Sequence, residues 1–359
     1  MSSVQLNLYK NGNVCTPGER ITGTVECFAN TAKTISAIKV VFKGTGKTGW
    51  TERESYYDYQ HRLQHTNVMY SSKENYFFRE ITLVQGITEL SPGSHSYAFA
   101  FILPPSGLPS SYEGTYGNIR YHIKATVVRS WNTNLVHKIP LELFAPLNLN
   151  YSPYLRNPIT TSVDKTMWSC LCNDKNILVF NMSLPVTGFV PGQDINIGAH
   201  VQNLTRVNVA NVQFKIVQHL EFLTRNPRTN AKHMKNIIAT HTEGGIGAHG
   251  EKSWTSTVRV PTRKGYPNFE SCTIMKASYR LKATLIVPGP HRNLENEIDL
   301  VIGGIPLIGV STSFTGGPPP AIPTVHTTSE QQMEEPTASG NVDNFEEPPL
   351  YKDVHHDKY

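Results

Sequence analysis

The chain of 359 residues has little cysteine, no long apolar run and no clear helical patterning. Its five cysteines are an odd number in a long sequence, which favours a reduced protein over a disulfide-linked one. The longest nearly apolar run, 300–310, contains three glycines and a proline. It is far shorter than the ~20 residues that cross a bilayer. These absences argue against a disulfide scaffold, a membrane-spanning protein and a helical bundle.

The opening residues, MSSVQLNLYK, lack a basic region followed by an apolar one. A secretory signal peptide needs both, so we expect none here. Together with the cysteine usage, this predicts a cytoplasmic protein.

Signatures of catalysis and metal binding are also missing, since neither G-x-S-x-G nor H-E-x-x-H occurs. Cys170 and Cys172 are too close together for a zinc pair, and no second pair stands at a usual distance. His61 and His65 could share a metal on a helix, but the polar segment around them favours a solvated loop. We therefore expect no catalytic residue, no metal, no cofactor and no enzymatic activity.

Two glycine-rich stretches resemble functional loops. Residues 44–49, GTGKTG, match the dinucleotide pattern G-x-G-x-x-G, but no helix follows to direct its N-terminal amides at a phosphate. A flexible hairpin loop is the expectation there. Residues 244–247, GGIG, are most simply a flexible turn.

Charge is unevenly distributed along the chain. From residue 315 onward there are eight acidic and two basic residues, a net charge of −6, which leaves +11 for residues 1–314 out of a total of +5. A basic body is attracted to anionic lipid headgroups or acidic peptide segments. An even spread of lysines for solubility would explain the same total.

An internal repeat is the strongest organisational signal. The segment 121–126, YHIKAT, returns as YRLKAT at 279–284, and TPGERI at 16–21 returns as VPGQDI at 190–195. The two offsets differ by 16 residues, so the first copy carries a longer insertion. The tyrosine-rich stretch from about Trp50 to Glu74 is the obvious place for it.

Apolar residues alternate with polar ones in the repeated segments, as in strands that bury one face. The residues expected to face inward are Phe99, Phe101, Leu103, Tyr121, Ile123, Ala125, Val127, Ile195, Ile197, Ala199, Val201, Tyr279, Leu281, Ala283 and Leu285. This pattern predicts an all-β protein of two tandem immunoglobulin-like β-sandwiches. We expect the sandwiches at 1–147 and 166–312, with a linker at 148–165.

The last part of the chain, 313–359, is rich in Pro, Ser, Thr, Glu and Gly, and we expect it to be disordered. Near its end stand Pro348, Pro349, Leu350 and Tyr351, a P-P-x-Y motif. Two prolines pre-form a polyproline II segment that enters the aromatic groove of a WW domain at little entropic cost. A chance match in a proline-rich tail is the competing explanation.

Residues 1–312 resemble the arrestin-domain-containing proteins, or α-arrestins. The resemblance lies in Gly18-Glu19-x-Ile21, in Val41-Phe42-Lys43-Gly44 followed by Trp50, and in Leu103-Pro104-Pro105. It is most specific in Ser111-Tyr112-Glu113-Gly114 followed by GNIRYHIKA at 117–125, and it returns in LVIGGIPL at 300–307. Many α-arrestins carry several P-P-x-Y motifs in their tails, whereas this chain has one.

The resemblance implies a non-catalytic trafficking adaptor. Its arrestin-like domains would bind cytoplasmic segments of membrane receptors or transporters, and the tail would recruit a WW-domain HECT-class ubiquitin ligase. Ubiquitination and endocytic sorting of the cargo would follow, at the plasma membrane and endosomes. The implied alternative is an arrestin-fold endosomal scaffold or coat component that works without a ligase. No nucleic-acid partner is expected.

Overall fold

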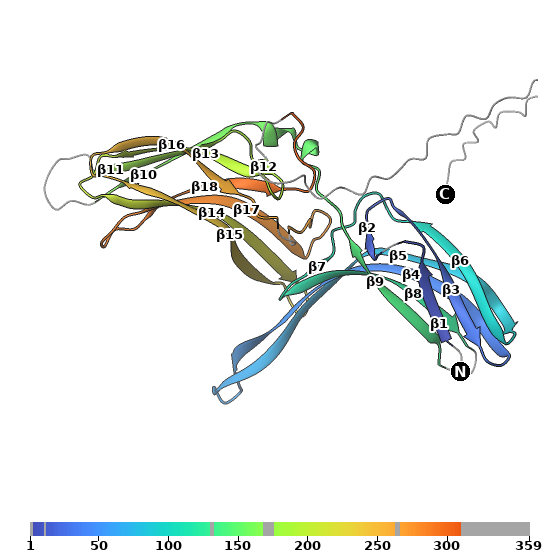
Figure 1. Cartoon of the computed structure of the whole chain (residues 1–359). Helices are drawn as coiled ribbons and strands as arrows, with labels where there is room; N and C mark the ends of the chain where they lie inside the picture. The colour runs from blue at the N-terminus through green and yellow to red at the C-terminus, as the bar shows by residue number, and fades with distance from the viewer. Residues whose placement is uncertain (1–2, 11, 130–132, 168–175, 263–265, 310–359) are drawn as a thin grey trace, which may run out of the picture. The chain divides into compact units, whose positions relative to one another are not determined.

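The computed structural model of the chain contains two β-sandwiches (Figure 1). It describes residues 3–10, 12–129, 133–167, 176–262 and 266–309. Within these residues the helical elements are two short 3-10 helices, η1 (Leu149–Tyr151) and η2 (Pro153–Arg156). The predicted all-β class with two tandem sandwiches is therefore confirmed, and the tail, 313–359, lies outside the described residues.

The N-terminal sandwich packs a three-stranded sheet on a larger one. The smaller sheet contains, in spatial order, β1 (Ser3–Leu8), β3 (Arg20–Ala29) and β6 (Gly93–Ile102). The larger sheet contains, in order, β2 (Val14–Cys15), β9 (Leu135–Leu143), β8 (Gly117–Val128), β4 (Lys33–Tyr57) and β5 (Leu63–Leu90), with β7 (Tyr112–Glu113) paired to β8. Apart from the parallel pair of β2 and β9, these strands run antiparallel.

The C-terminal sandwich repeats this plan with one extra strand. Its smaller sheet contains β10 (Ile159–Thr166), β11 (Ile177–Leu184), β13 (Asp194–Asn203) and β16 (Glu251–Arg259). Its larger sheet contains β12 (Gly188–Phe189), β18 (Leu294–Ile302), β17 (Met275–Ile286), β14 (Val209–Thr224) and β15 (Asn230–Ile246).

The sequence repeat is a repeat of topology. The order β2-β9-β8-β4-β5 in the first sandwich corresponds strand for strand to β12-β18-β17-β14-β15 in the second. The repeated YHIKAT and YRLKAT segments lie in β8 and β17, the matching middle strands. The repeated Pro-Gly turns precede β3 and β13, with Gly18 and Gly192 both at positive φ.

The period-two alternation correctly identified the core faces. Every residue expected to face inward is buried, including Tyr121 and Tyr279 in the two matching strands. Between them lie polar residues such as His122, Lys124 and Lys282, which remain at least partly exposed. One-sided burial of strands is what sets the register of each sheet.

The insertion in the first copy is a hairpin extension and not the loop that was predicted. Strands β4 and β5 pair continuously from Lys33 with Leu90 to Tyr57 with Leu63, far longer than the β14–β15 hairpin. The tyrosine-rich stretch is therefore two strands, and its turn lies around His61. The loop expectation failed because alternation is weak in a ribbon whose two faces are both largely polar.

The glycine-rich stretch 44–49 is also a correction, since it lies inside β4 and forms no loop. A Cβ on Gly44 would lie 2.2 Å from the ring of Tyr121, its neighbour on β8. A Cβ on Gly46 would lie 2.3 Å from the Tyr76 hydroxyl. Glycine is needed here so that two aromatic rings can lie directly on the backbone. In the other glycine-rich stretch, 244–247, Gly244 and Gly245 also lie in a strand, β15, and not in a turn.

The segment expected to link the sandwiches, 148–165, is structured. It contains η1, η2 and most of β10. Strand β10 pairs antiparallel with β11 along its whole length, so it belongs to the C-terminal sandwich. Asn148 caps η1 by accepting a hydrogen bond from the Asn150 backbone N–H (3.0 Å).

The N-terminal core continues into the second sandwich. Residues from the β14 and β17 region are buried in one cluster with the N-terminal core: Leu220, Phe222, Phe269, Cys272, Ile274 and Met275. Phe222 is fully buried, with its ring 5.8 Å from that of Tyr116 and 6.4 Å from that of Tyr112. Apolar burial therefore joins the two sandwiches directly.

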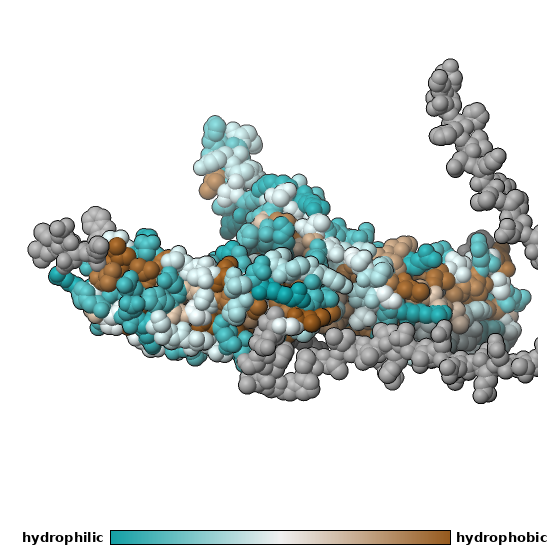
Figure 2. Space-filling view, turned by 90° about the horizontal axis from the view of Figure 1, so that it is seen from above, coloured by the Kyte–Doolittle hydropathy of each residue, from teal (hydrophilic) through white to brown (hydrophobic). Residues whose placement is uncertain are grey.

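Elsewhere the surface is mixed in character. In the view of Figure 2, hydrophobic residues form separate patches with polar residues between them. Scattered patches of this kind are normal for proteins in water. No helix among the described residues is long and apolar enough to cross a membrane.

Replacing Phe222 by alanine tests the shared core. Loss of a fully buried aromatic ring should lower the free energy of unfolding by about 3 kcal/mol or more. Denaturant unfolding measures this, with Phe78→Ala as the matched control, because Phe78 is 59% exposed. Equal losses for the two variants would contradict the role given to Phe222.

Candidate functional site

Charged side chains at the extended part of the β4–β5 hairpin bind the second sandwich. Glu52 forms an ion pair with Lys232 and accepts a hydrogen bond from Asn230 (3.0 Å). Glu54 forms an ion pair with Arg228 (2.7 Å) and accepts a hydrogen bond from the Tyr70 hydroxyl. We call these contacts the hairpin clasp.

The hairpin clasp is ionised at neutral pH. The hydrogen bond from Lys232 lowers the pKa of Glu52, and that from Tyr70 lowers the pKa of Glu54. The Arg228 guanidinium also lies over the Tyr70 ring, 5.5 Å from its centroid. Because the charged groups remain partly exposed to solvent, they orient the hairpin more than they stabilise it.

Closer to the shared core, the contacts between hairpin and second sandwich are neutral or backbone-mediated. The Ser71 N–H donates to the Asn226 carbonyl (2.8 Å), and the Thr273 N–H donates to Glu74 (3.1 Å). The Tyr76 hydroxyl lies 3.0 Å from Cys272 Sγ. Burial raises the pKa of the Cys272 thiol, so this sulfur is a packed group and not a reactive nucleophile.

A second feature is a basic face on the outer side of the larger sheet of the N-terminal sandwich. His122 lies opposite Lys43 in the ladder, and Lys124 lies opposite Lys138. Like charges directly opposite each other in a sheet are unfavourable. Among the described residues these three lysines form no ion pair, and the nearby Glu80 is engaged by Lys39 (2.7 Å). We call His122 and its three lysines the basic face.

The basic face keeps its histidine neutral. Burial, together with the charges of Lys138, Lys43 and Lys124, lowers the pKa of His122 to about 4. A positive potential concentrated in this way attracts anions.

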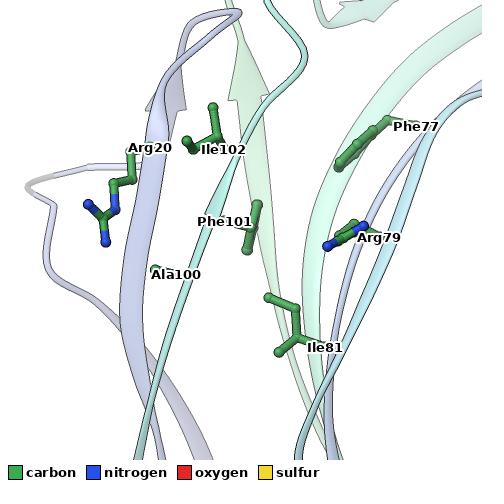
Figure 3. Close-up of a pocket in the computed structure, with 7 residues that line it drawn as sticks. All are labelled: Arg20, Phe77, Arg79, Ile81, Ala100, Phe101 and Ile102. Atoms are coloured by element: carbon green, nitrogen blue, oxygen red, sulfur yellow. The ribbon is translucent and has the colours of Figure 1, made fainter. Parts of the chain in front are cut away.

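The third feature is a recess at the open side of the N-terminal sandwich, with a volume of about 610 Å³ (Figure 3). Phe77, Ile81, Phe101 and Ile102 give it apolar walls, and Arg20 and Arg79 stand beside them. Phe77 and Phe101 both pack on Phe42, with ring centroids 4.9 and 5.3 Å away. We call this the edge recess.

The residues predicted from sequence fall outside these three features. Pro348, Pro349, Leu350 and Tyr351 lie outside the described residues, as do Cys170 and Cys172. His61 and His65 lie near the turn of the hairpin, where His65 bonds Ser55 (2.8 Å). In the part of the chain that the structure describes, no group of three His, Cys, Asp or Glu side chains is placed to hold a metal.

The hairpin clasp is what sequence reasoning missed. Glu52 and Glu54 are two residues apart in a strand, so they share one face, and Arg228 and Lys232 are cations in the segment they meet. The alternation of the two glutamates was a visible signal. The cations that pair with these glutamates could not be identified from the sequence, because they lie more than 170 residues away along the chain.

Comparison with known proteins agrees with the fold. A model of the arrestin (or S-antigen) N-terminal domain matches residues 3–150, and one of the arrestin C-terminal domain matches residues 174–307. The chain belongs to the arrestin-domain-containing, or α-arrestin, family. The two matches fall on the two sandwiches, so each sandwich is an arrestin domain.

Three relatives match the chain at low sequence identity. Arrestin domain-containing protein 17 of Caenorhabditis elegans is 24% identical over 304 residues, which cover 80% of this chain and 67% of that protein. Arrestin domain-containing protein 4 of Mus musculus is 27% identical over 67% of this chain and 57% of its own length. Arrestin domain-containing protein 1 of Homo sapiens is 24% identical over 79% and 61% respectively. The chain thus spans between 57% and 67% of the length of these three relatives.

The low pKa of His122 predicts how the stability of the folded protein depends on pH. Its pKa in the folded protein, about 4, lies below the ordinary 6.5, so the unfolded chain binds the extra proton between these values. Stability should therefore fall as the pH falls from about 6.5 to 4, and His122→Gln should lessen this fall.

NMR titration of the His122 ring and thermal unfolding at several pH values measure the two effects. The control is His233→Gln, which replaces an exposed histidine on β15 outside the basic face. A His122 titration midpoint near 6.5 would refute the description of the basic face.

Proposed function

We propose that this protein is a non-catalytic trafficking adaptor. Its arrestin domains bind cytoplasmic segments of membrane receptors or transporters, and the P-P-x-Y motif at 348–351 recruits a WW-domain HECT-class ubiquitin ligase. The cargo is then ubiquitinated and sorted by endocytosis at the plasma membrane and endosomes. The observation that carries the proposal is the presence of two arrestin domains and a P-P-x-Y motif in one chain.

The physical basis of recruitment is a pre-formed ligand. Pro348 and Pro349 restrict the backbone to polyproline II, and Tyr351 supplies an aromatic anchor at the right spacing. A single short motif binds weakly, with a Kd of about micromolar to millimolar. Useful recruitment then needs several WW domains or co-localisation at a membrane.

The basic face supports a position beside the membrane. A membrane leaflet rich in anionic lipid attracts nearby lysines by about 1 kcal/mol each. Three lysines on one sheet face, with no ion pair to another described residue, would hold the adaptor near the cytoplasmic segments of its cargo and release it at high salt.

Replacing Tyr351 by alanine should abolish capture of the full chain by immobilised WW domains. Phosphorylation of Tyr351 should do the same, because a dianion would have to enter an apolar groove. The matched control is Tyr359→Ala, a tyrosine of the same tail outside the motif. Equal capture of wild type and Tyr351→Ala would sink ligase recruitment by this motif and favour a scaffold that acts without a ligase.

Replacing Lys43, Lys124 and Lys138 together by glutamine should weaken binding to phosphatidylserine vesicles about tenfold or more at low salt. Vesicle co-sedimentation measures this. The control removes the same charge elsewhere, at Lys33, Lys235 and Lys276. If both triple variants lose binding equally, the net charge of the body and not the basic face is responsible.

A further inference from the structure

The edge recess lies beside the edge of β6. It is lined by three consecutive residues of that strand, Ala100, Phe101 and Ile102. Consecutive strand residues point to opposite faces, so a space that touches all three must lie along the strand's edge. Strand β5 contributes alternate residues, Phe77, Arg79 and Ile81, so the recess also covers one face of β5. The space is therefore bounded by the edge of one sheet and the core-facing side of the other.

The edge of β6 presents backbone groups that are not used inside the described structure. Strand β6 is the last of its sheet and pairs only with β3 among the described residues. The Leu103 N–H, just beyond β6, donates to the Glu19 carbonyl (2.9 Å), toward β3. Because an antiparallel strand alternates its bonding direction, Ala98, Ala100 and Ile102 direct their N–H and C=O groups away from β3. An incoming strand could bond all of them.

The charges beside this edge are positive. Arg79 projects from the core-facing side of β5 between Phe77 and Ile81, and Arg20 lies opposite Ile102 in the ladder (Figure 3). Neither arginine forms an ion pair with another described residue, and the neighbouring Glu19 is engaged by Lys10. Arg79 is on the core side of the edge, whereas Arg20, next to the buried Ile21, is on the outer side with Ile102. A strand added beside β6 therefore needs a carboxylate on each of its faces, with apolar side chains flanking the one on the core side.

We propose that the edge recess is a peptide-binding site, where an extended acidic segment of a partner protein adds as a fourth strand beside β6. Its backbone bonds Ala98, Ala100 and Ile102. On the core side, two apolar side chains cover Phe77 and Phe101 with a carboxylate between them at Arg79, and on the outer side a second carboxylate meets Arg20. The chemistry of the bound peptide follows from the residues of the edge recess and does not depend on the P-P-x-Y motif. It rests on the proposed adaptor function only for the assignment of that peptide to a membrane cargo.

Two other occupants fit less well. A lipid headgroup has no peptide backbone, so it cannot pair with the row of N–H and C=O groups along the edge of β6. A second copy of this chain, pairing β6 with β6, would bring two sets of Arg20 and Arg79 to one seam.

The test uses the full chain and a labelled peptide, Thr-Val-Glu-Glu-Thr-Val-Thr, which as a strand carries Val, Glu and Val on one face and a Glu on the other, with its Glu→Gln analogue. Fluorescence polarisation should show saturable binding of the acidic peptide that weakens with salt, and at least about tenfold weaker binding of the analogue. Arg79→Gln and Arg20→Gln should each weaken the acidic peptide severalfold. Arg53→Gln, an exposed arginine on the hairpin, is the matched control and should bind as the wild type does.

A backbone variant separates strand addition from simple charge attraction. Ala100→Pro removes one outward N–H, leaves the bonds to β3 intact and should abolish binding. Ala100→Val keeps the N–H and should bind. Hydrogen exchange should show protection of the Ala98, Ala100 and Ile102 amides when peptide is added, which also confirms that the wild type is folded at this edge.

Three outcomes would overturn the proposal. The first is no binding by the wild type, and the second is peptide binding that Arg79→Gln and Ala100→Pro leave unchanged. The third is dimerisation that Ala100→Pro abolishes, which would assign the edge to a second copy.

Tyr351→Ala should bind the peptide as the wild type does. Failure of WW capture with intact peptide binding would therefore leave this site standing. Failure of peptide binding with intact capture would remove this site alone.

Discussion

The burial of Phe222 and its neighbours in the N-terminal core is the contact on which the rest of the described structure depends. Apolar burial is the main source of stability, and here it crosses from one arrestin domain to the other. Once Phe222 lies beside Tyr112 and Tyr116, the long β4–β5 hairpin runs alongside β14, and its glutamates reach Arg228 and Lys232. The partly exposed ion pairs then orient a contact that apolar burial has already made.

Unequal sheets explain where the N-terminal arrestin domain leaves space. A five-strand path faces a three-stranded sheet, so the core-facing side of β5 extends past the edge of β6. In the C-terminal domain the smaller sheet has a fourth strand, β10, supplied by the segment between the domains. Strand β10 adjoins β11, the equivalent of β1, so β6 and its equivalent β16 are both edge strands, and Arg79 is the polar residue on the face of β5 that lies beside β6.

The described surfaces offer different chemistries to the partners of the proposed adaptor. The basic face suits a charged membrane surface, the edge recess suits an extended peptide, and the hairpin clasp ties the two domains together. The P-P-x-Y motif belongs to a separate part of the chain. An adaptor needs contacts that work at the same time, and surfaces on different elements do not compete for one partner.

Local patterns in the sequence by themselves determined the all-β class, the inward faces of β8 and β17, the duplication, and the P-P-x-Y motif. Each depends on period-two alternation or on short spacing, which neighbouring residues specify directly. Only the tertiary structure decided that 44–49 is a strand under two aromatic rings, that the tyrosine-rich stretch is a docked hairpin, and that Lys43, Lys124 and Lys138 surround His122. These features join residues far apart in the chain, and such contacts are fixed by packing between strands, which no local pattern encodes.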